Sequence, residues 1–293
     1  MISKFRIGAL VIILNFFASV AMIWGQDNPS LLQMAVPSLN IAPDARGGGM
    51  GDMGAATLPD INSQYWNAAK YAFMGSKAGV SLSYTPWLRK LVNDVALVNM
   101  TGYYKLGNSD LQAISASLRY FSLGEVNIWE NIGDVPYGLN PYEMAFDVAY
   151  SRKLSESYSM AVTLRYIRSD MGTDQNDESN AGNAFSADIS GYLEKYVLMG
   201  NAEALWSFGF NLSNIGSKIS YDGGNTNQYL PAKLTLGTGL LYPIDDYNQI
   251  GVYLDLNKYM VPYAPQKEEG ETDADYQTRV DDYKSCLLYT SDA

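Results

Sequence analysis

The stretch Ser159-Met-Ala-Val-Thr-Leu-Arg-Tyr-Ile167 decides the fold. Its apolar members alternate with small or polar ones, so that Met160, Val162, Leu164 and Tyr166 oppose Ser159, Ala161, Thr163 and Arg165. A period of two predicts a β-strand with one apolar and one polar face.

The same period recurs along most of the chain. We expect strands at 78–86, 94–104, 111–121, 142–151, 158–168, 184–193, 204–213, 231–241 and 250–259. Strands of about ten residues, with aromatic residues such as Tyr84, Tyr120 and Tyr242 near their ends, are typical of an outer-membrane β-barrel. The side chains expected to face lipid are Ile114, Leu118, Val162, Leu164, Phe208, Phe210, Val252 and Leu254. Those expected to face the lumen are Arg119, Asp147, Arg165 and Asp188.

Long and short connections alternate between these strands. The long ones are Ser122–Pro141, Ser169–Asn183 and Asn214–Leu230, and the mostly short ones are Lys105–Asp110, Arg152–Ser157, Glu194–Glu203 and Tyr242–Gln249. Outer-membrane barrels have short periplasmic turns and longer outer loops, so the first strand is expected to run outward from a periplasmic N-terminus. Because such barrels have even strand numbers and tolerate no open edge, we expect a truncated barrel over residues 77–285. The last residues, Cys286–Ala293, resemble translated sequencing read-through and are expected to be non-native.

The N-terminus has the order of a secretory signal peptide. Lys4 and Arg6 precede the apolar run Ile7–Val20, and small residues follow. The run is shorter than the roughly 20 residues of a membrane-spanning helix, so cleavage is expected, after Gly25 or after Ala21. We therefore assign residues 1–25 to the signal peptide and 26–76 to an N-terminal periplasmic or plug segment.

The composition argues against an enzyme. The chain carries a net charge of −11, has no histidine and has a single cysteine, Cys286. Nucleic acid is therefore an unfavourable partner, and the commonest general base and metal ligand are missing. We expect no cofactor and no metal.

Three patterns resemble ligand sites, and each favours a structural interpretation. Gly49-Met-Gly51-Asp-Met-Gly54 matches a dinucleotide motif, but no strand precedes it and no carboxylate follows at the required distance, so we expect a loop. The carboxylates Asp170, Asp174, Asp177 and Glu178 lack the order of a calcium loop and are expected in a solvated outer loop. The inward carboxylates Glu143, Asp147, Asp188 and Asp255 are expected to pair with Arg119 and Arg165 in a wet lumen.

Several motifs, in one order, resemble the PorV family. They are IAPDARGGGMGDMGAAT (41–57), YWNAAKYA (65–72), VSLSYTPWLRKLVNDV (80–95), SLRYFSLGEV (117–126), DVAYSRKLSE (147–156), RYIRSD (165–170) and NLSNIGSKISY (211–221). This family supplies outer-membrane components of the type IX secretion system of Bacteroidetes, within the FadL-like barrel superfamily. The resemblance implies about 14 strands when complete, of which these would be the first nine, around a lumenal plug. The plug residues would be Asp44, Arg46, Gly49, Gly51, Trp66 and Asn67. The run Asn67-Ala68-Ala69 departs from the Asn-Pro-Ala usual in the superfamily.

The resemblance also implies a function. The chain would be a carrier that accepts secreted cargo by its C-terminal signal domain and passes it to the sortase-like attachment machinery, in contact with the translocon, outer-membrane lipid and lipopolysaccharide. The alternatives are a FadL-like transporter of hydrophobic small molecules and a lipopolysaccharide-modification factor. For the carrier we expect cargo contacts at Trp87, Leu88, Arg89, Trp129 and Tyr137 and in the acidic stretch Glu268–Asp282. The Trp87–Arg89 segment is equally consistent with an interfacial anchor.

Overall fold

The computed structural model describes residues 34–87, 94–107, 110–128, 137–172, 181–200, 202–221, 227–262, 265, 267 and 270–285. The expected signal peptide and C-terminal tail lie outside the described residues. The chain divides into two compact units, and residues 33–262 form the one that contains the sheet. Helix α4, Asp273–Ser285, belongs largely to the other unit. The last strand of the sheet ends at Tyr259. The region 77–285 that the sequence assigns to the barrel therefore also contains an acidic helix, which lacks the alternation of apolar and polar residues seen in the strands.

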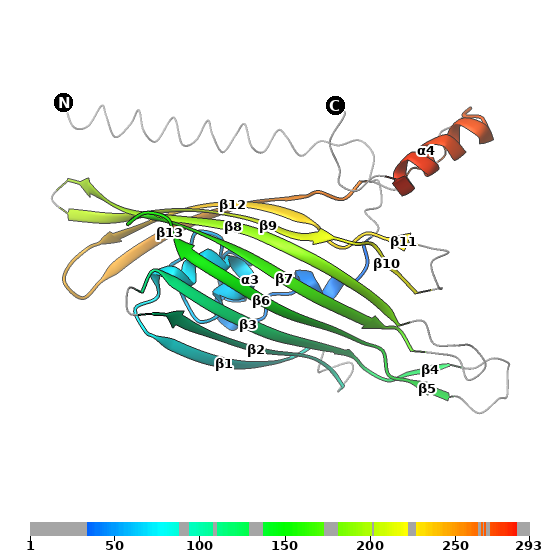
Figure 1. Ribbon diagram of the computed structural model, residues 1–293, viewed down its shortest axis with the longest axis horizontal. Coiled ribbons are helices and arrows are strands. Elements are labelled where there is room, and N and C mark those ends of the chain that lie inside the picture. The colour runs from blue at the N-terminus through cyan, green and yellow to red at the C-terminus, as the bar shows by residue number, and fades with distance from the viewer. Residues whose placement is uncertain are drawn as a thin grey trace. The chain divides into compact units, whose positions relative to one another are not determined.

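Nine antiparallel strands form one sheet, in the order β1-β2-β3-β6-β7-β8-β9-β12-β13. Their bounds are β1 Ala78–Pro86, β2 Val95–Leu106, β3 Gln112–Leu123, β6 Tyr142–Lys153, β7 Tyr158–Asp170, β8 Gly182–Met199, β9 Ala202–Gly216, β12 Lys233–Pro243 and β13 Gln249–Tyr259. The expected all-β antiparallel fold and its nine strands are confirmed. The sheet curves around the N-terminal helices, and β1 and β13 form its two edges (Figure 1).

The two faces of the sheet differ as the period of two predicts. On the face away from the N-terminal helices, Val162 is 51% exposed, and on the inner face the neighbouring Arg165 is 6% exposed. The expected outward set lies on the outer face, although Phe210 is half-buried because its ring packs over Gly191. Among the described helices, none is long and apolar enough to cross a membrane.

The connections differ from the expected ones in three places. The connection expected at Glu194–Glu203 is wrong, because β8 continues to Met199 and β9 begins at Ala202, with pairing up to the turn. The first long loop contains a hairpin of β4, Val126–Ile128, and β5, Tyr137–Leu139. The third contains a hairpin of β10, Ile219–Ser220, and β11, Asn227–Gln228. These two hairpins are at the end of the sheet that we call the long-loop end, and the tight turns are at the short-turn end.

The N-terminal segment fills the inside of the curved sheet as a plug. Its elements are η2 Pro37–Asn40, α2 Ala45–Gly49, α3 Ser63–Trp66 and η3 Ala68–Phe73. At the long-loop end, Ala35, Val36 and Leu39 pack with wall residues such as Ile167 and Ile219. At the short-turn end, Ala69 and Tyr71 pack with Tyr103 and Tyr192. The plug therefore runs the length of the lumen.

The described part of the plug begins beside the third long connection of the sheet. Met34 forms a bridge with Tyr229 beside β11, and the Ala35 N–H donates to the Tyr229 carbonyl at 2.9 Å. The first described residues are thus at the long-loop end, and the chain reaches the short-turn end only at η3. The apolar side chains of Ala35, Val36 and Leu39, which need a buried partner, account for this course.

Candidate functional site

Trp66 is the buried side chain around which the glycine-rich part of the plug packs. Its indole is 9% exposed, and its Nε1–H donates to Oδ1 of Asp44 at 2.9 Å. The other oxygen of Asp44 accepts from the Gly47 N–H at 2.8 Å and so caps helix α2. A Cβ at Gly47 or at Gly54 would lie 2.3 Å from the indole ring. Gly47 and Gly54 therefore leave room for the indole ring of Trp66. This packing explains the glycines at these two positions without a cofactor.

The other expected plug residues have smaller roles. Arg46 pairs with Asp60 at 2.6 Å, and its side chain is 44% exposed. Gly51 has φ +78°, a value that favours glycine, whereas a Cβ at Gly49 would meet nothing. Asp44 and Arg46 thus bond to other residues of the plug.

Asn67 joins the plug to the wall. Its Nδ2 donates to the carbonyls of Ala55 and of Gly191 in β8, both at 2.9 Å. Its Oδ1 accepts from the Ala69 N–H at 3.1 Å, which caps η3. Ala68 is the first residue of η3, a position that suits proline, so alanine fits there without a change of backbone.

Lys70 is fully buried in the plug. Its Nζ donates to the Gly54 carbonyl at 2.8 Å and to Oγ1 of Thr57 at 3.1 Å. Burial lowers the pKa of Lys70 from 10.5 to about 8. This ammonium ties η3 to the glycine-rich loop.

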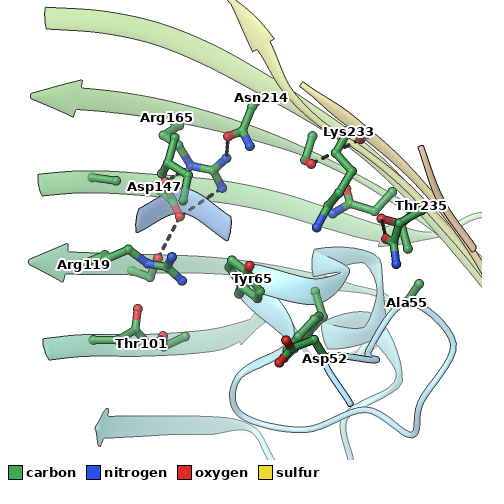
Figure 2. Close-up of a pocket in the computed structure, with 18 of the residues that line it drawn as sticks. Asp52, Ala55, Tyr65, Thr101, Arg119, Asp147, Arg165, Asn214, Lys233 and Thr235 are labelled. Carbon is green, nitrogen blue, oxygen red and sulfur yellow. Dashed lines mark hydrogen bonds and ion pairs between the residues drawn. The ribbon is translucent and has the colours of Figure 1, made fainter. Parts of the chain in front are cut away.

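A buried ion-pair network crosses the inner face of four strands, and Figure 2 shows its Asp147, Arg165 and Asn214 side chains. Arg165 of β7 donates from Nε to Asp147 of β6 at 2.6 Å and from Nη2 to Asp188 of β8 at 2.9 Å. It also bonds Oδ1 of Asn214, whose N–H donates to Asp188 at 2.7 Å. The pairing of Arg165 expected from the sequence is confirmed, because a buried charge is tolerated only with such partners.

A second cation holds the plug directly. Arg119 of β3 donates from Nη1 to the carbonyls of Ser38 at 2.7 Å and Ile41 at 3.1 Å, and its guanidinium is 4.6 Å from the Tyr65 ring centroid. Glu143 of β6 accepts from the Ser38 N–H at 3.0 Å. The sheet therefore bonds both backbone polar groups of Ser38 in η2, the N–H through Glu143 and the carbonyl through Arg119.

Further ties hold the plug from one edge of the sheet to the other. The wall-to-plug bonds include Ser83–Pro43, Lys105–Met74, Ser115–Gln64, Ser159–Ala69, Ser207–Ala56 and Asp255–Gly54. Two wall glycines let the backbones approach: a Cβ at Gly209 would lie 1.9 Å from the Ala55 carbonyl oxygen, and one at Gly237 would lie 2.9 Å from the Ala55 Cβ.

One small cavity between plug and wall is lined mainly by polar residues. A cavity of about 30 Å³ is lined by Tyr65 and Asp52 of the plug and by wall residues that include Arg119, Lys233 and Thr235 (Figure 2). No cluster of three or more histidine, cysteine, aspartate or glutamate side chains with metal-binding geometry occurs in the described part of the chain. The site is suited to holding the plug, with room for little more than ordered water.

The larger hollow is on the outer face. Its volume is about 430 Å³, and it forms where Gly102 and Ala116 leave space between Tyr104, Leu118 and Phe146. Its lining is almost wholly apolar, so this hollow offers carbon atoms and few hydrogen-bonding groups.

The expected cargo contacts are only partly described. Trp87 follows β1 and is 39% exposed, with its N–H donating to the Val95 carbonyl. Leu88, Arg89 and Trp129 lie outside the described residues, as do Asp174, Asp177 and Glu178, and Tyr137 is described only as the first backbone residue of β5. In the acidic stretch, Glu271 pairs with Arg279 at 2.6 Å.

Sequence reasoning found the wall charges and missed three plug and cavity residues. Arg119, Arg165 and Asp188 were detectable because each is a charged residue at a strand position that the period of two assigns to the inner face. Tyr65 and Lys70 carry no such signal, because the plug has no regular period. Lys233 carries none, because a lysine near a strand end usually marks the interface between membrane and water.

One comparison with known proteins identifies the chain. A search of the curated proteins found no match. The family model described as "Type IX secretion system protein PorV" matches residues 25–267, which includes the plug and the whole described sheet. The chain therefore belongs to the PorV family of type IX secretion system proteins.

Proposed function

We propose that this protein is an outer-membrane carrier of the type IX secretion system, which receives secreted proteins by their C-terminal signal domain and passes them to the surface attachment machinery. The outward face of the sheet, with side chains such as Val162 and Leu164, would meet lipid. The short-turn end would then be periplasmic and the long-loop end would be at the cell surface.

The filled lumen is the observation that carries this proposal. Arg119 and Glu143 bond both polar groups of Ser38, and Asn67 bonds Gly191. The cavity between plug and sheet in the described residues is about 30 Å³, and this close packing supports a route for cargo outside the lumen. Cargo must then be handled at the outer surface, where the long loops provide residues that vary in polarity and shape.

The same observation weighs against the FadL-like transporter. A fatty-acid site needs an enclosed apolar pocket, and pockets for small molecules occupy about 300–1,000 Å³. The lumenal cavity is polar and far smaller, and the apolar hollow of about 430 Å³ opens outward. Lipopolysaccharide modification has no residue constellation in the described chain to support it.

The test uses the outer loop that follows β1. The double substitution Trp87→Ala and Arg89→Ala removes an exposed aromatic and a cation, the two side-chain types that most often anchor interfaces. In cells that produce the protein from its own gene, we expect the variant to insert and to remain heat-modifiable. Co-purification of secreted C-terminal signal domains should fall by about tenfold or more.

A matched change at the other end serves as control. Leu111, just before β3, is 45% exposed at the short-turn end, and Leu111→Ala should leave cargo recovery unchanged. Full cargo recovery with the double variant, and also with Trp129→Ala added, would contradict the carrier role as placed here. Equal losses in the loop variants and in Leu111→Ala would show a general defect and would equally contradict it.

A further inference from the structure

The hollow on the outer face forms where neighbouring strands carry short side chains in the same row. Gly102 of β2 is directly opposite Ala116 of β3. The outward rows on either side carry the larger side chains of Tyr104, Ile114, Leu118 and Phe146. The space of about 430 Å³ that results is almost wholly apolar, and it falls within the roughly 300–1,000 Å³ of small-molecule sites.

The fold itself does not require a glycine at position 102. Gly102 is not among the glycines with positive φ, and a Cβ there would have its nearest atoms at 3.6 Å, an ordinary van der Waals contact. The pairing of β2 with β1 and with β3 runs in continuous register, without a bulge. A glycine inside a strand weakens the strand, and it often marks a bulge or the close approach of a ligand or another backbone. With neither a bulge nor a close backbone here, space for a ligand accounts for Gly102.

A single cation faces outward beyond the short-turn side of the hollow. Strands β1, β2, β3 and β6 are described throughout, and Arg152 of β6 is the one charged side chain at their outward positions. Arg152 is exposed, and none of the described carboxylates pairs with it. Its guanidinium is therefore available to an anionic group.

The other charged side chains near this end of the hollow point inward or lie in turns. Lys105 and Lys153 face inward and contact the plug. Lys77, just before β1, pairs with Asp110 at 3.5 Å. Glu156 is exposed in the turn that follows β6. A ligand that extends from the hollow along β6 would therefore meet Arg152 before any other charge.

The spacing between the hollow and this cation matches a lipid. Val148 lines the hollow, and Arg152 follows it by four residues on the same face of β6, which is about 14 Å along the strand. The hydrocarbon core of a bilayer is about 30 Å thick, so an acyl chain of one leaflet spans about 15 Å. Tyr150 lies between the two residues and donates its hydroxyl to Oε1 of Gln112 at 2.8 Å, as suits a tyrosine at the membrane interface.

We propose that this part of the outer face binds one anionic phospholipid of the periplasmic leaflet, with its phosphate at Arg152 and one acyl chain in the hollow. A guanidinium can give two parallel hydrogen bonds to phosphate oxygens, and an uncompensated cation favours a headgroup with net negative charge. The acyl chain gains van der Waals contacts in a space that the side chains leave open. The site rests on the proposed membrane placement and goes beyond the carrier function, because it is separate from the loops that would receive cargo.

The experiment maps lipid contacts by photo-cross-linking. The purified whole protein is placed in phosphatidylcholine bilayers that contain a small fraction of phosphatidylglycerol with a diazirine in its acyl chain, and labelled residues are identified by mass spectrometry. Labelling of Leu118, beside the hollow, should exceed that of Leu164, on the same face outside it, by about fivefold. Unlabelled phosphatidylglycerol should compete for Leu118, and additional phosphatidylcholine should not.

Filling the hollow should abolish the preference for it. The double substitution Gly102→Leu and Ala116→Leu occupies the space, so labelling of Leu118 should fall to the level at Leu164. Ala187→Leu adds the same side chain elsewhere on the outer face, in β8, and should leave the labelling of Leu118 unchanged. Heat-modifiability shows that each variant is inserted.

The headgroup contact is tested at the cation. Arg152→Gln should lower the preference for phosphatidylglycerol over phosphatidylcholine at the hollow by about fivefold, because one cation near the headgroups is removed. Lys195→Gln removes an exposed cation of β8 at the same end of the sheet and should leave the preference unchanged. Equal effects of the two substitutions would contradict a headgroup site at Arg152.

The wild-type labelling pattern separates failure of this site from failure of the membrane placement. Equal labelling of Leu118 and Leu164 would show only bulk lipid on the outer face and would overturn the lipid site alone. Labelling of Leu164 without Leu118 would show that another occupant, such as a second copy of this chain, covers the hollow, and would also overturn it. Labelling of neither residue would contradict the membrane placement itself.

Discussion

Arg165 makes five hydrogen bonds to three side chains, and all of them are on the inner face of the sheet. Its partners Asp147 and Asp188 come from the strands on either side. Without the guanidinium, two carboxylates would face each other in a space closed by the plug. The pairing is therefore a condition for burying these charges at all.

Replacing this arginine should destabilise the fold strongly. For Arg165→Met we expect a loss of about 3–5 kcal/mol in the free energy of unfolding, because two buried carboxylates lose their cation. The measurement is the urea midpoint in detergent. The triple variant Arg165→Met, Asp147→Asn, Asp188→Asn is the control, and it should recover much of the loss. A urea midpoint for Arg165→Met equal to that of the wild type would show that the network contributes nothing to the free energy of unfolding.

Lys70 makes stability depend on pH in a defined direction. Its pKa is about 8 in the folded protein, below the ordinary 10.5, so between these values the unfolded chain binds more protons. Stability should therefore rise as the pH increases from about 8 towards 10.5. The difference in urea midpoint between wild type and Lys70→Met isolates this group, since other titrations are common to both. A difference that stays constant or falls over that range would contradict a charged, desolvated Lys70.

At the scale of elements, close contact between plug and wall depends on glycine at defined points of the strands. Gly209 of β9 lies against the backbone of Ala55, where a Cβ would be 1.9 Å from the carbonyl oxygen. Gly102 of β2 faces outward, and its nearest atoms would be 3.6 Å away. Both positions are glycines within strands, and they differ in that the plug contacts the strand at Gly209 and not at Gly102.

The paired substitutions Gly209→Ala and Gly102→Ala test this contact. We expect Gly209→Ala to displace the plug at a cost of about 1–3 kcal/mol, because backbone atoms cannot move aside, and Gly102→Ala to be neutral. Trypsin provides the measurement, since Lys70 is fully buried and cleavage after it requires that the plug leave the lumen. Plug fragments in equal amounts from both variants would mean that Gly209 is not a contact point.

The strands were predictable from the residue pattern, and the contacts of the plug were not, for a physical reason. A strand that separates an apolar from a polar surface repeats every two residues, so nine strands could be counted and Arg119 and Arg165 assigned to the inner face. The contacts of the plug join residues far apart in sequence, such as Ser38 with Glu143 and Asn67 with Gly191, and no local pattern encodes them. The continuation of β8 was missed because Glu194 and Lys195 look like a turn, although pairing with β9 continues past them.

At the scale of the whole molecule, the sheet has a polar inner face and an apolar outer face, the reverse of the arrangement in a water-soluble protein. The inner face holds charged and hydroxyl groups bonded to a plug, and the outer face holds exposed aliphatic and aromatic side chains such as Leu164 and Phe146. That arrangement fits the proposed placement of this PorV-family protein, with the outer face in lipid and the inner face against the plug.

Fluorescence quenching by lipids with brominated acyl chains tests this central claim most directly. Two single-tryptophan proteins are compared in bilayers, one keeping only Trp66 and one carrying Phe146→Trp with every other tryptophan replaced by phenylalanine. Phe146 is 45% exposed on the outer face, and Trp66 is 9% exposed in the plug. We predict strong quenching of the indole introduced at position 146 and almost none of Trp66. Quenching of Trp66 as strong as that at position 146, or no quenching at position 146, would contradict an outer face in lipid around a sealed lumen.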